Sequence, residues 1–215
     1  LLGQSVGLNI IMFIAEEDRS KISLRLKILK MIFPNFHIIF CEDIKSYKKL
    51  VPLFDLSKII EKESIDVIEI LKKNIEYVVT VDDDVIYSPY LIENHIKFVK
   101  SDRILCNSAM VIEKDIKYKY WSINKKVGIR KDILPVGAGS ILYPYKHLKK
   151  ISGNFMEQAP TCDDIWFFSC LKNHCEYYFH DPDDFISISR FINQKESLYS
   201  NNSIDLNDIA VKKLL

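Results

Sequence analysis

The sequence predicts an α/β protein with a mostly parallel, doubly wound central sheet. Over the first hundred residues, short apolar runs rich in Ile, Val and Phe alternate with segments of helical periodicity. Continuous apolar runs are typical of strands buried on both faces. Strands that alternate with helices form right-handed β-α-β units, in which the strands run parallel.

The predicted elements follow in chain order. The expected strands are residues 9–15, 36–41, 77–81, 104–111, 141–143 and 177–179. The expected helices are residues 21–33, 65–74, 88–100, 165–172 and 206–214. Pro34 ends the first helix, and Ser88 before Pro89 is typical of a helix N-cap. Because no repeat or linker is visible, we expect one domain over residues 1–215, with residues 191–215 as a C-terminal surface extension.

Composition excludes several classes of protein. The 215 residues include 30 Lys and Arg against 29 Asp and Glu, and the resulting net charge of +1 argues against a dedicated nucleic-acid binder. The longest uncharged apolar run, residues 7–15, is about half of the ~20 residues that a membrane-spanning helix needs. Five cysteines at scattered spacings favour reduced thiols over a disulfide framework. Together these features predict a cytoplasmic protein.

Three consecutive carboxylates, Asp82, Asp83 and Asp84, directly follow a predicted strand. Ligands bind at the carboxyl ends of strands in open α/β sheets. If the chain stays extended, Asp82 and Asp84 point the same way and can share a hard cation such as Mg²⁺ or Mn²⁺. The alternative is a solvated acidic turn, but a turn needs only one Asp and adjacent like charges repel. We therefore favour a metal site.

Two further segments carry polar or conformationally special residues. Asp163 and Asp164 open a predicted helix after Thr161, where the helix dipole keeps carboxylates ionised. Thr161 with Asp164 also resembles a capping box, which would make Asp164 structural, and both interpretations stay open. Gly137 and Gly139 lie one residue apart and allow close approach of the backbone to a ligand, although taken alone such a loop is more often a plain turn.

In combination, these segments resemble a known enzyme family. The stretches TVDDDVIYSPYLI, LPVGAGSILYP and APTCDDIWFFSCL are similar to those of GT-A glycosyltransferases, in particular the bacterial family-2-like enzymes that build surface polysaccharides. The resemblance spans residues 2–202. It implies a Rossmann-like α/β/α fold with a mostly parallel sheet, here without the first strand of the family. It also implies transfer of a sugar from a nucleotide-diphosphate donor, for which we expect a UDP-sugar, to a glycan hydroxyl.

On the nucleotide side, the resemblance assigns roles to individual residues. The family's metal-binding pair falls on Asp82 and Asp84, with Asp83 beside the nucleotide. The late histidine of the family, a metal or diphosphate ligand, corresponds to His180. Lys49 matches a lysine that precedes the acidic strand, which implies a contact with the donor. The implied cofactor is Mn²⁺ or Mg²⁺.

The remaining roles concern the acceptor side. Gly137 and Gly139 would line the donor-sugar and acceptor site, and the acidic pair Asp163 and Asp164 would supply the catalytic base, with Asp164 in that role. The implied partners are a nucleotide-sugar donor and a glycan or lipid-linked glycan acceptor. An acceptor of that kind leaves open a peripheral position at the inner face of the plasma membrane. Two alternatives stay open: a metal-dependent nucleotidyltransferase, and an inactive relative that binds only sugar or a partner protein.

Overall fold

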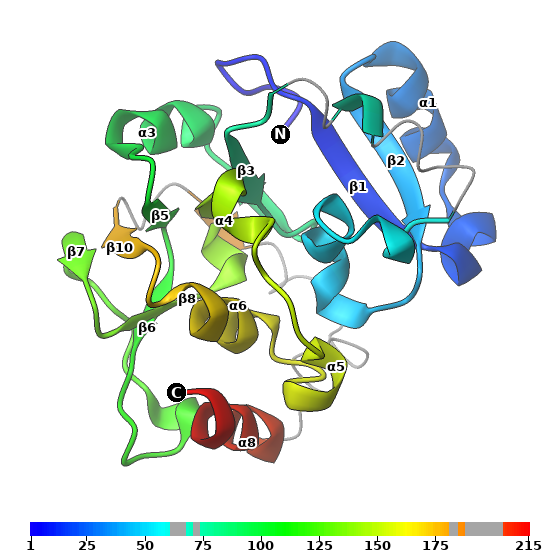
Figure 1. Ribbon diagram of the computed structural model, residues 1–215. Helices are drawn as coiled ribbons and strands as arrows, with labels where there is room; N and C mark the ends of the chain where they lie inside the picture. The colour runs from blue at the N-terminus through cyan, green and yellow to red at the C-terminus, as the bar shows by residue number, and fades with distance from the viewer. Residues whose placement is uncertain (61–67, 71–73, 181–184, 188–203) are drawn as a thin grey trace. The chain divides into compact units, whose positions relative to one another are not determined.

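Figure 1 shows the computed structural model of the chain, which describes residues 1–60, 68–70, 74–180, 185–187 and 204–215. The chain forms two compact units, Leu1–Ile75 and Glu76–Leu215, and each is described by itself. Both contain strands and helices, so the α/β class is confirmed. The prediction of one domain over residues 1–215 stays a prediction. Within the described residues, no helix is long and apolar enough to cross a membrane.

The first unit is built on a β-α-β motif. Strands β1 (Ile10–Ala15) and β2 (Phe36–Cys41) pair in parallel, as predicted. Helix α1 (Leu24–Ile32) connects them and begins after Ser23, whose Oγ accepts a hydrogen bond from the N–H of Leu26 at 3.3 Å. The part of this unit that the structure describes also contains the 3-10 helices η1 (Glu16–Lys21), η2 (Lys45–Lys49), η3 (Val51–Leu53) and η4 (Leu56–Lys58).

The second unit holds the remaining described elements. Its strands are β3 (Tyr77–Thr80), β4 (Val85–Tyr87), β5 (Arg103–Cys106), β6 (Ala109–Val111), β7 (Gly128–Arg130), β8 (Ile133–Pro135), β9 (Ile141–Pro144), β10 (Glu176–Phe179) and β11 (Phe185–Ser187). Its helices are α3 (Leu91–Phe98), α4 (Tyr145–Leu148), α5 (Phe155–Gln158), α6 (Asp163–Leu171) and α8 (Ile204–Leu214), with the 3-10 helices η6 (Tyr118–Tyr120) and η7 (Gly137–Gly139). Strand β4 pairs with β11, and β6 pairs with β8.

The main sheet of the second unit has the strand order β3-β9-β5-β10-β7. Figure 1 labels four of these strands, β3, β5, β10 and β7. Strands β3, β5 and β10 run in one direction, while β9 runs against both β3 and β5. The edge strand β7 is antiparallel to β10. The prediction of a mostly parallel sheet is therefore wrong for this unit. The physical reason is that β9 inserts between two strands of equal direction, which the β-α-β pattern alone would make neighbours.

Helix α6 packs its apolar side chains against this sheet. The ring centroids of Phe167 and Tyr143 of β9 are 6.1 Å apart, and those of Phe168 and Tyr177 of β10 are 4.9 Å apart. Helix α8 packs in turn on the start of α6, where the Cys162 thiol donates to Asn207 Oδ1 at 2.8 Å. This core fixes the start of α6 relative to the sheet.

Some predicted boundaries differ from the structure. Helix α3 begins at Leu91 after Tyr90, so the prediction of Ser88 as its N-cap is wrong; Ser88 Oγ instead accepts from the N–H of Tyr90 at 3.2 Å. The predicted strand 104–111 is two strands, β5 and β6, which belong to different sheets. Most of the predicted helix 65–74 and residues 188–203 of the C-terminal extension lie outside the described residues. All five cysteines are free thiols, as predicted.

Candidate functional site

The predicted site segments meet at one edge of the main sheet. Thr80 of β3 lies opposite Ile141 of β9. Ile141 also lies opposite Cys106 of β5, and Cys106 lies opposite Phe179 of β10. Because β3, β5 and β10 run the same way, the residues that follow them leave the sheet at this edge. Carboxyl ends of strands are where open α/β sheets bind ligands.

The glycine loop, residues 137–139, enters β9 at this edge and is tightly packed. A Cβ on Gly139 would lie 2.5 Å from Ser108 Cβ and 2.7 Å from the backbone nitrogen of Ser108. Ser108 also accepts a hydrogen bond from the N–H of Val136 at 3.0 Å, and Gly137 is buried. The loop is therefore held against the segment that follows β5, in a way that requires glycine at position 139.

The acidic loop, residues 81–84, follows β3 at the same edge. Asp83 and Asp84 form a turn before β4 and are exposed, while Asp82 is half-buried. The expectation that this run stays extended, with Asp82 and Asp84 on one side of it, is therefore wrong, because the chain turns to form β4. The carboxylates nevertheless lie at the carboxyl end of a strand, as predicted.

A tyrosine that the sequence did not single out joins the acidic loop to the glycine loop. Tyr87 of β4 accepts a hydrogen bond at its Oη from the N–H of Asp82 at 2.9 Å. The same hydroxyl donates to the carbonyl oxygen of Ala138 at 3.3 Å. One side chain thus ties the backbones of the two loops together.

Asp164 joins the glycine loop to helix α6. The N–H of Gly137 donates to Asp164 Oδ2 at 3.1 Å. Helix α6 begins after Cys162 and has no side-chain cap, so the interpretation of Thr161 as its N-cap is wrong. Asp163 is buried, with 6% of its surface exposed. The carboxylate of Asp164 therefore contacts the glycine loop, and its predicted role as catalytic base or structural cap stays open.

The acidic pair at the start of α6 acts electrostatically on Tyr143 of β9. The pKa of the Tyr143 hydroxyl is raised well above its ordinary value, first by burial and then by the negative charges of Asp164 and Asp163. Tyr143 therefore stays neutral at physiological pH.

Behind the glycine loop lies a buried chain of polar side chains. His180 Nε2 is 2.9 Å from His95 Nδ1, and His95 Nε2 is 2.9 Å from Ser140 Oγ. Ser140 Oγ donates to Asn107 Oδ1 at 2.9 Å. None of these four side chains is more than 1% exposed. Ser140, Asn107 and His180 directly follow the glycine loop, β5 and β10, so the register of the sheet brings them together.

The hydrogen bonds of this chain determine where the protons lie. Because Ser140 gives its only hydroxyl proton to Asn107, His95 Nε2 must donate to Ser140. Burial, and then the neighbouring His180, lower the pKa of His95 to about 3, so its ring is neutral and Nδ1 accepts. His180 therefore carries its proton on Nε2. The metal contact predicted for His180 would have to use Nδ1, and it stays a prediction.

Ser140 holds an unusual backbone conformation at the end of the glycine loop. Its φ of 115° and ψ of 146° lie in a region that residues with a Cβ rarely adopt. Such a conformation costs on the order of 1–3 kcal/mol and persists only where the surroundings enforce it. Here the hydrogen bonds with His95 and Asn107 enforce it.

The predicted metal ligands are not gathered into one cluster. In the part of the chain that the structure describes, no group of three or more His, Cys, Asp and Glu side chains is arranged to hold a metal ion. Asp82, Asp84 and His180 therefore do not form a complete ligand set by themselves. Two carboxylates in one loop still fit Mg²⁺ or Mn²⁺, which commonly take further oxygens from a phosphate. Lys49 lies in η2 of the first unit, and its contact with the donor stays a prediction.

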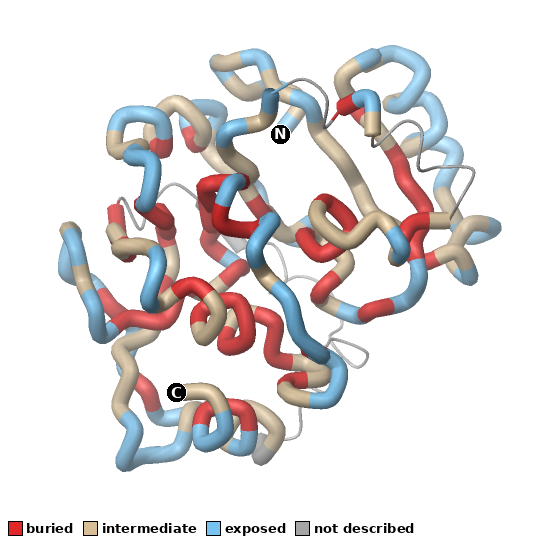
Figure 2. Tube along the Cα trace, in the orientation of Figure 1, coloured by how far each residue is buried: buried red, intermediate tan, exposed pale blue. Residues whose placement is uncertain are grey.

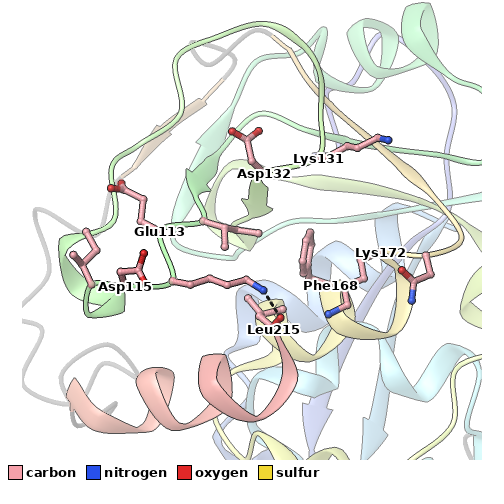
Figure 3. Close-up of a pocket in the computed structure, with 11 residues that line it drawn as sticks. Glu113, Asp115, Lys131, Asp132, Phe168, Lys172 and Leu215 are labelled. Atoms are coloured by element: carbon pink, nitrogen blue, oxygen red, sulfur yellow. Dashed lines mark hydrogen bonds between the residues drawn. The ribbon is translucent and has the colours of Figure 1, made fainter.

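A separate pocket of about 790 Å³ lies in the second unit (Figure 3). It is lined by Ile112, Glu113, Lys114, Asp115, Ile116, Lys131, Asp132, Phe168, Lys172, Asn173 and Leu215, and by none of the predicted site residues. Lys114 Nζ donates to the carbonyl oxygen of Leu215, and Lys172 Nζ donates to that of Leu214 at 2.9 Å. These lysines anchor the end of α8, so we interpret the pocket as packing space beside that helix.

Comparison of the chain with protein-family models and with curated proteins gives no match. The functional argument therefore depends on the geometry and on the motifs. Sequence reasoning missed Tyr87, His95, Ser140 and Asn107. The hydrogen bonds among His95, Ser140, Asn107 and His180 join residues 33 to 85 positions apart, and the bond of Tyr87 to Ala138 spans 51 positions, so no local pattern marks these contacts. The position of Ser140 directly after the paired glycines was the only local hint.

Proposed function

We propose that the protein is a GT-A-type glycosyltransferase that transfers a sugar from a UDP-linked donor to a hydroxyl of a glycan or lipid-linked glycan. One observation carries the proposal: the acidic loop, the glycine loop and Asp164 converge at one sheet edge, joined through Tyr87 and Gly137. The reaction class, sugar transfer, comes from the resemblance of these motifs to those of GT-A glycosyltransferases. The convergence of the motifs in space supports the proposal that they form one site. These are also the carboxyl ends of strands, where a ligand is expected.

The nucleotide side of the proposed site is the acidic loop. Asp82 and Asp84 would hold Mn²⁺ or Mg²⁺, and the ion when bound would offset the negative charge of the leaving diphosphate. Asp83 is exposed in the same turn, within a loop whose backbone is held by Tyr87. On the other side, the glycine loop exposes Ala138 and lets its backbone approach the donor sugar.

Asp164 is the proposed general base. Its Oδ2 accepts the N–H of Gly137, which orients the carboxylate. The second oxygen, Oδ1, is buried in this structure. It would accept the proton of the attacking hydroxyl only when a bound acceptor reaches it. A base on the acceptor side leads to a single displacement with inversion at the anomeric carbon. Asp163, buried beside it, adds negative charge that favours transfer of that proton to the pair.

The role of Asp164 is tested by Asp164→Asn. The amide oxygen can still accept the N–H of Gly137, but it cannot take a proton. We expect turnover to fall by about 10²–10⁴-fold, with UDP affinity and the free energy of unfolding unchanged. The matched control is Asp115→Asn, an exposed aspartate of the same unit. If Asp164→Asn unfolds while activity per folded molecule is retained, Asp164 is structural.

The donor site is tested by calorimetric titration of UDP with and without Mn²⁺. We expect binding that requires the metal and is lost in Asp82→Asn and Asp84→Asn, but not in Asp115→Asn. Incubation with an intact UDP-sugar and a glycan then separates the alternatives. A glycoside with release of UDP supports the proposal, and a nucleotidyl product with release of pyrophosphate supports a nucleotidyltransferase. Binding without any product supports the inactive relative.

A further inference from the structure

Helix α1 has two apolar faces, and only one of them is used by the core. The inner face carries Leu26 and Leu29, which pack against Phe36, Ile38 and Phe40 of β2. A surface helix needs one apolar stripe of this kind to attach to its sheet. A second apolar stripe therefore requires a separate explanation.

The second stripe consists of Leu24, Ile28, Met31 and Ile32, which we call the outer face of α1. Their exposed fractions are 71%, 43%, 84% and 62%. The spacing i, i+4, i+7 and i+8 places them side by side on a helix with 3.6 residues per turn. Figure 2 shows the exposed stretch along α1. Isolated exposed apolar residues are ordinary, but a contiguous stripe marks an interaction surface.

The charges of α1 restrict what can bind there. The helix carries Arg25, Lys27 and Lys30 and no acidic residue. All three are exposed, and the helical spacing puts Arg25 on one side of the outer face and Lys27 on the other. In the preceding η1, Glu16 and Asp18 are paired with Arg19 and Lys21. The outer face is thus an apolar stripe with positive borders.

We propose that the outer face of α1 docks on an anionic lipid surface, with its apolar side chains in the interface and its cations on the headgroups. An amphipathic helix with basic borders binds in this way, lying in the plane of the interface rather than spanning the bilayer. The nine residues of α1 are too few to span it. A second copy of this chain is disfavoured as the occupant, because two such faces would bring positive borders together.

The experiment uses co-sedimentation of the full chain with vesicles. Vesicles of phosphatidylcholine with about one-third phosphatidylglycerol are compared with vesicles of phosphatidylcholine alone. We expect binding to the anionic vesicles that weakens with salt and is at least about tenfold weaker without the anionic lipid. Lys27→Glu with Lys30→Glu, and separately Leu24→Ser with Met31→Ser, should each lower the partition coefficient about tenfold or more.

The control is Ile209→Ser, which removes an apolar side chain of α8 that is 56% exposed. It should bind like the unmodified protein. Circular dichroism of every variant establishes that the fold is kept, since all the changed side chains are exposed. Absence of binding, equal binding to both vesicle types, or loss of binding in Ile209→Ser would each overturn the proposal. Self-association that disappears in Leu24→Ser with Met31→Ser would assign the face to a second copy instead. The assay contains no nucleotide or sugar, so its outcome is independent of the proposed transferase activity.

Discussion

The two sides of the sheet-edge site are fixed to different degrees. The glycine loop is held at several points: Gly139 packs on Ser108, Gly137 donates to Asp164, and Ser140, directly after the loop, is an interior member of a fully buried polar chain. In the acidic loop, Asp83 and Asp84 lie exposed in a turn. The hydroxyl of Tyr87 links this loop to the glycine loop.

This difference indicates that the proposed site has one pre-organised side, the glycine loop with Asp164, and one side, the acidic loop, that is less constrained. In the buried polar chain, the direction of each hydrogen bond fixes the direction of the next. Breaking one bond would leave a buried polar group unsatisfied, so the side chains keep a single arrangement. The glycine loop and Asp164 are therefore pre-organised. The exposed carboxylates of the acidic loop are open to water, so under the proposed function their final arrangement would depend on the bound cation and diphosphate. Substitutions in the glycine loop should therefore mainly lower the free energy of unfolding, and substitutions that affect the acidic loop should mainly lower the affinity for UDP.

The largest expected effect on stability is that of Gly139→Ala. The new Cβ would overlap the backbone nitrogen of Ser108, which cannot move without disturbing β5, so we expect a loss on the order of 2–3 kcal/mol. Denaturant unfolding measures it. Ala138→Ser adds an atom at the exposed position of the same loop and should change stability very little. Equal stability of the two variants would show that the glycine loop is not rigid.

The buried chain should make stability depend on pH in a defined window. In the unfolded chain His95 takes up a proton below about pH 6.5, whereas in the folded protein its pKa is about 3. Between these values the unfolded state binds more protons, so the free energy of unfolding falls as the pH is lowered. The expected slope is about 1.4 kcal/mol per pH unit, and the contribution is constant above the window.

The matched variant for this dependence is His95→Gln, which does not titrate. Unfolding of both proteins is measured from pH 7 to pH 5. Both proteins contain the same carboxylates, so the titration of these groups cancels in the difference between the two. We expect the difference in stability between the two proteins to shrink as the pH falls. Parallel curves would show that His95 is not held neutral inside the fold.

The smallest expected effect on stability is that of Tyr87→Phe. It removes one hydroxyl that serves two backbone groups near the surface, so the loss should be about 1 kcal/mol or less. Because the acidic loop is then released, metal-dependent UDP affinity should fall more than stability does, by about 3–10-fold. Tyr90→Phe, at an exposed tyrosine, is the control. Unchanged affinity in Tyr87→Phe would mean that the acidic loop orders itself without this bridge.

The local features of the protein were predictable from its sequence. Strands β1 and β2 and their parallel pairing follow from apolar runs around a helical segment, and they were predicted almost to the residue. The positions of the acidic loop after β3 and of Asp163 and Asp164 at the start of α6 were predicted for the same reason. Each of these features depends on neighbours within a few residues, and propensity and periodicity act over that range.

Only the tertiary structure decided how these pieces meet. Strand β9 inserts antiparallel between β3 and β5, and this pairing depends on side-chain burial across the sheet rather than on any local pattern. The same register brings Ser140, Asn107 and His180 to one edge, where His95 completes the chain from α3. Hydrogen bonds between residues tens of positions apart leave no periodic trace in the sequence. The sequence by itself therefore determined which residues could carry the chemistry, and the packing of the sheet decided which of them share a site.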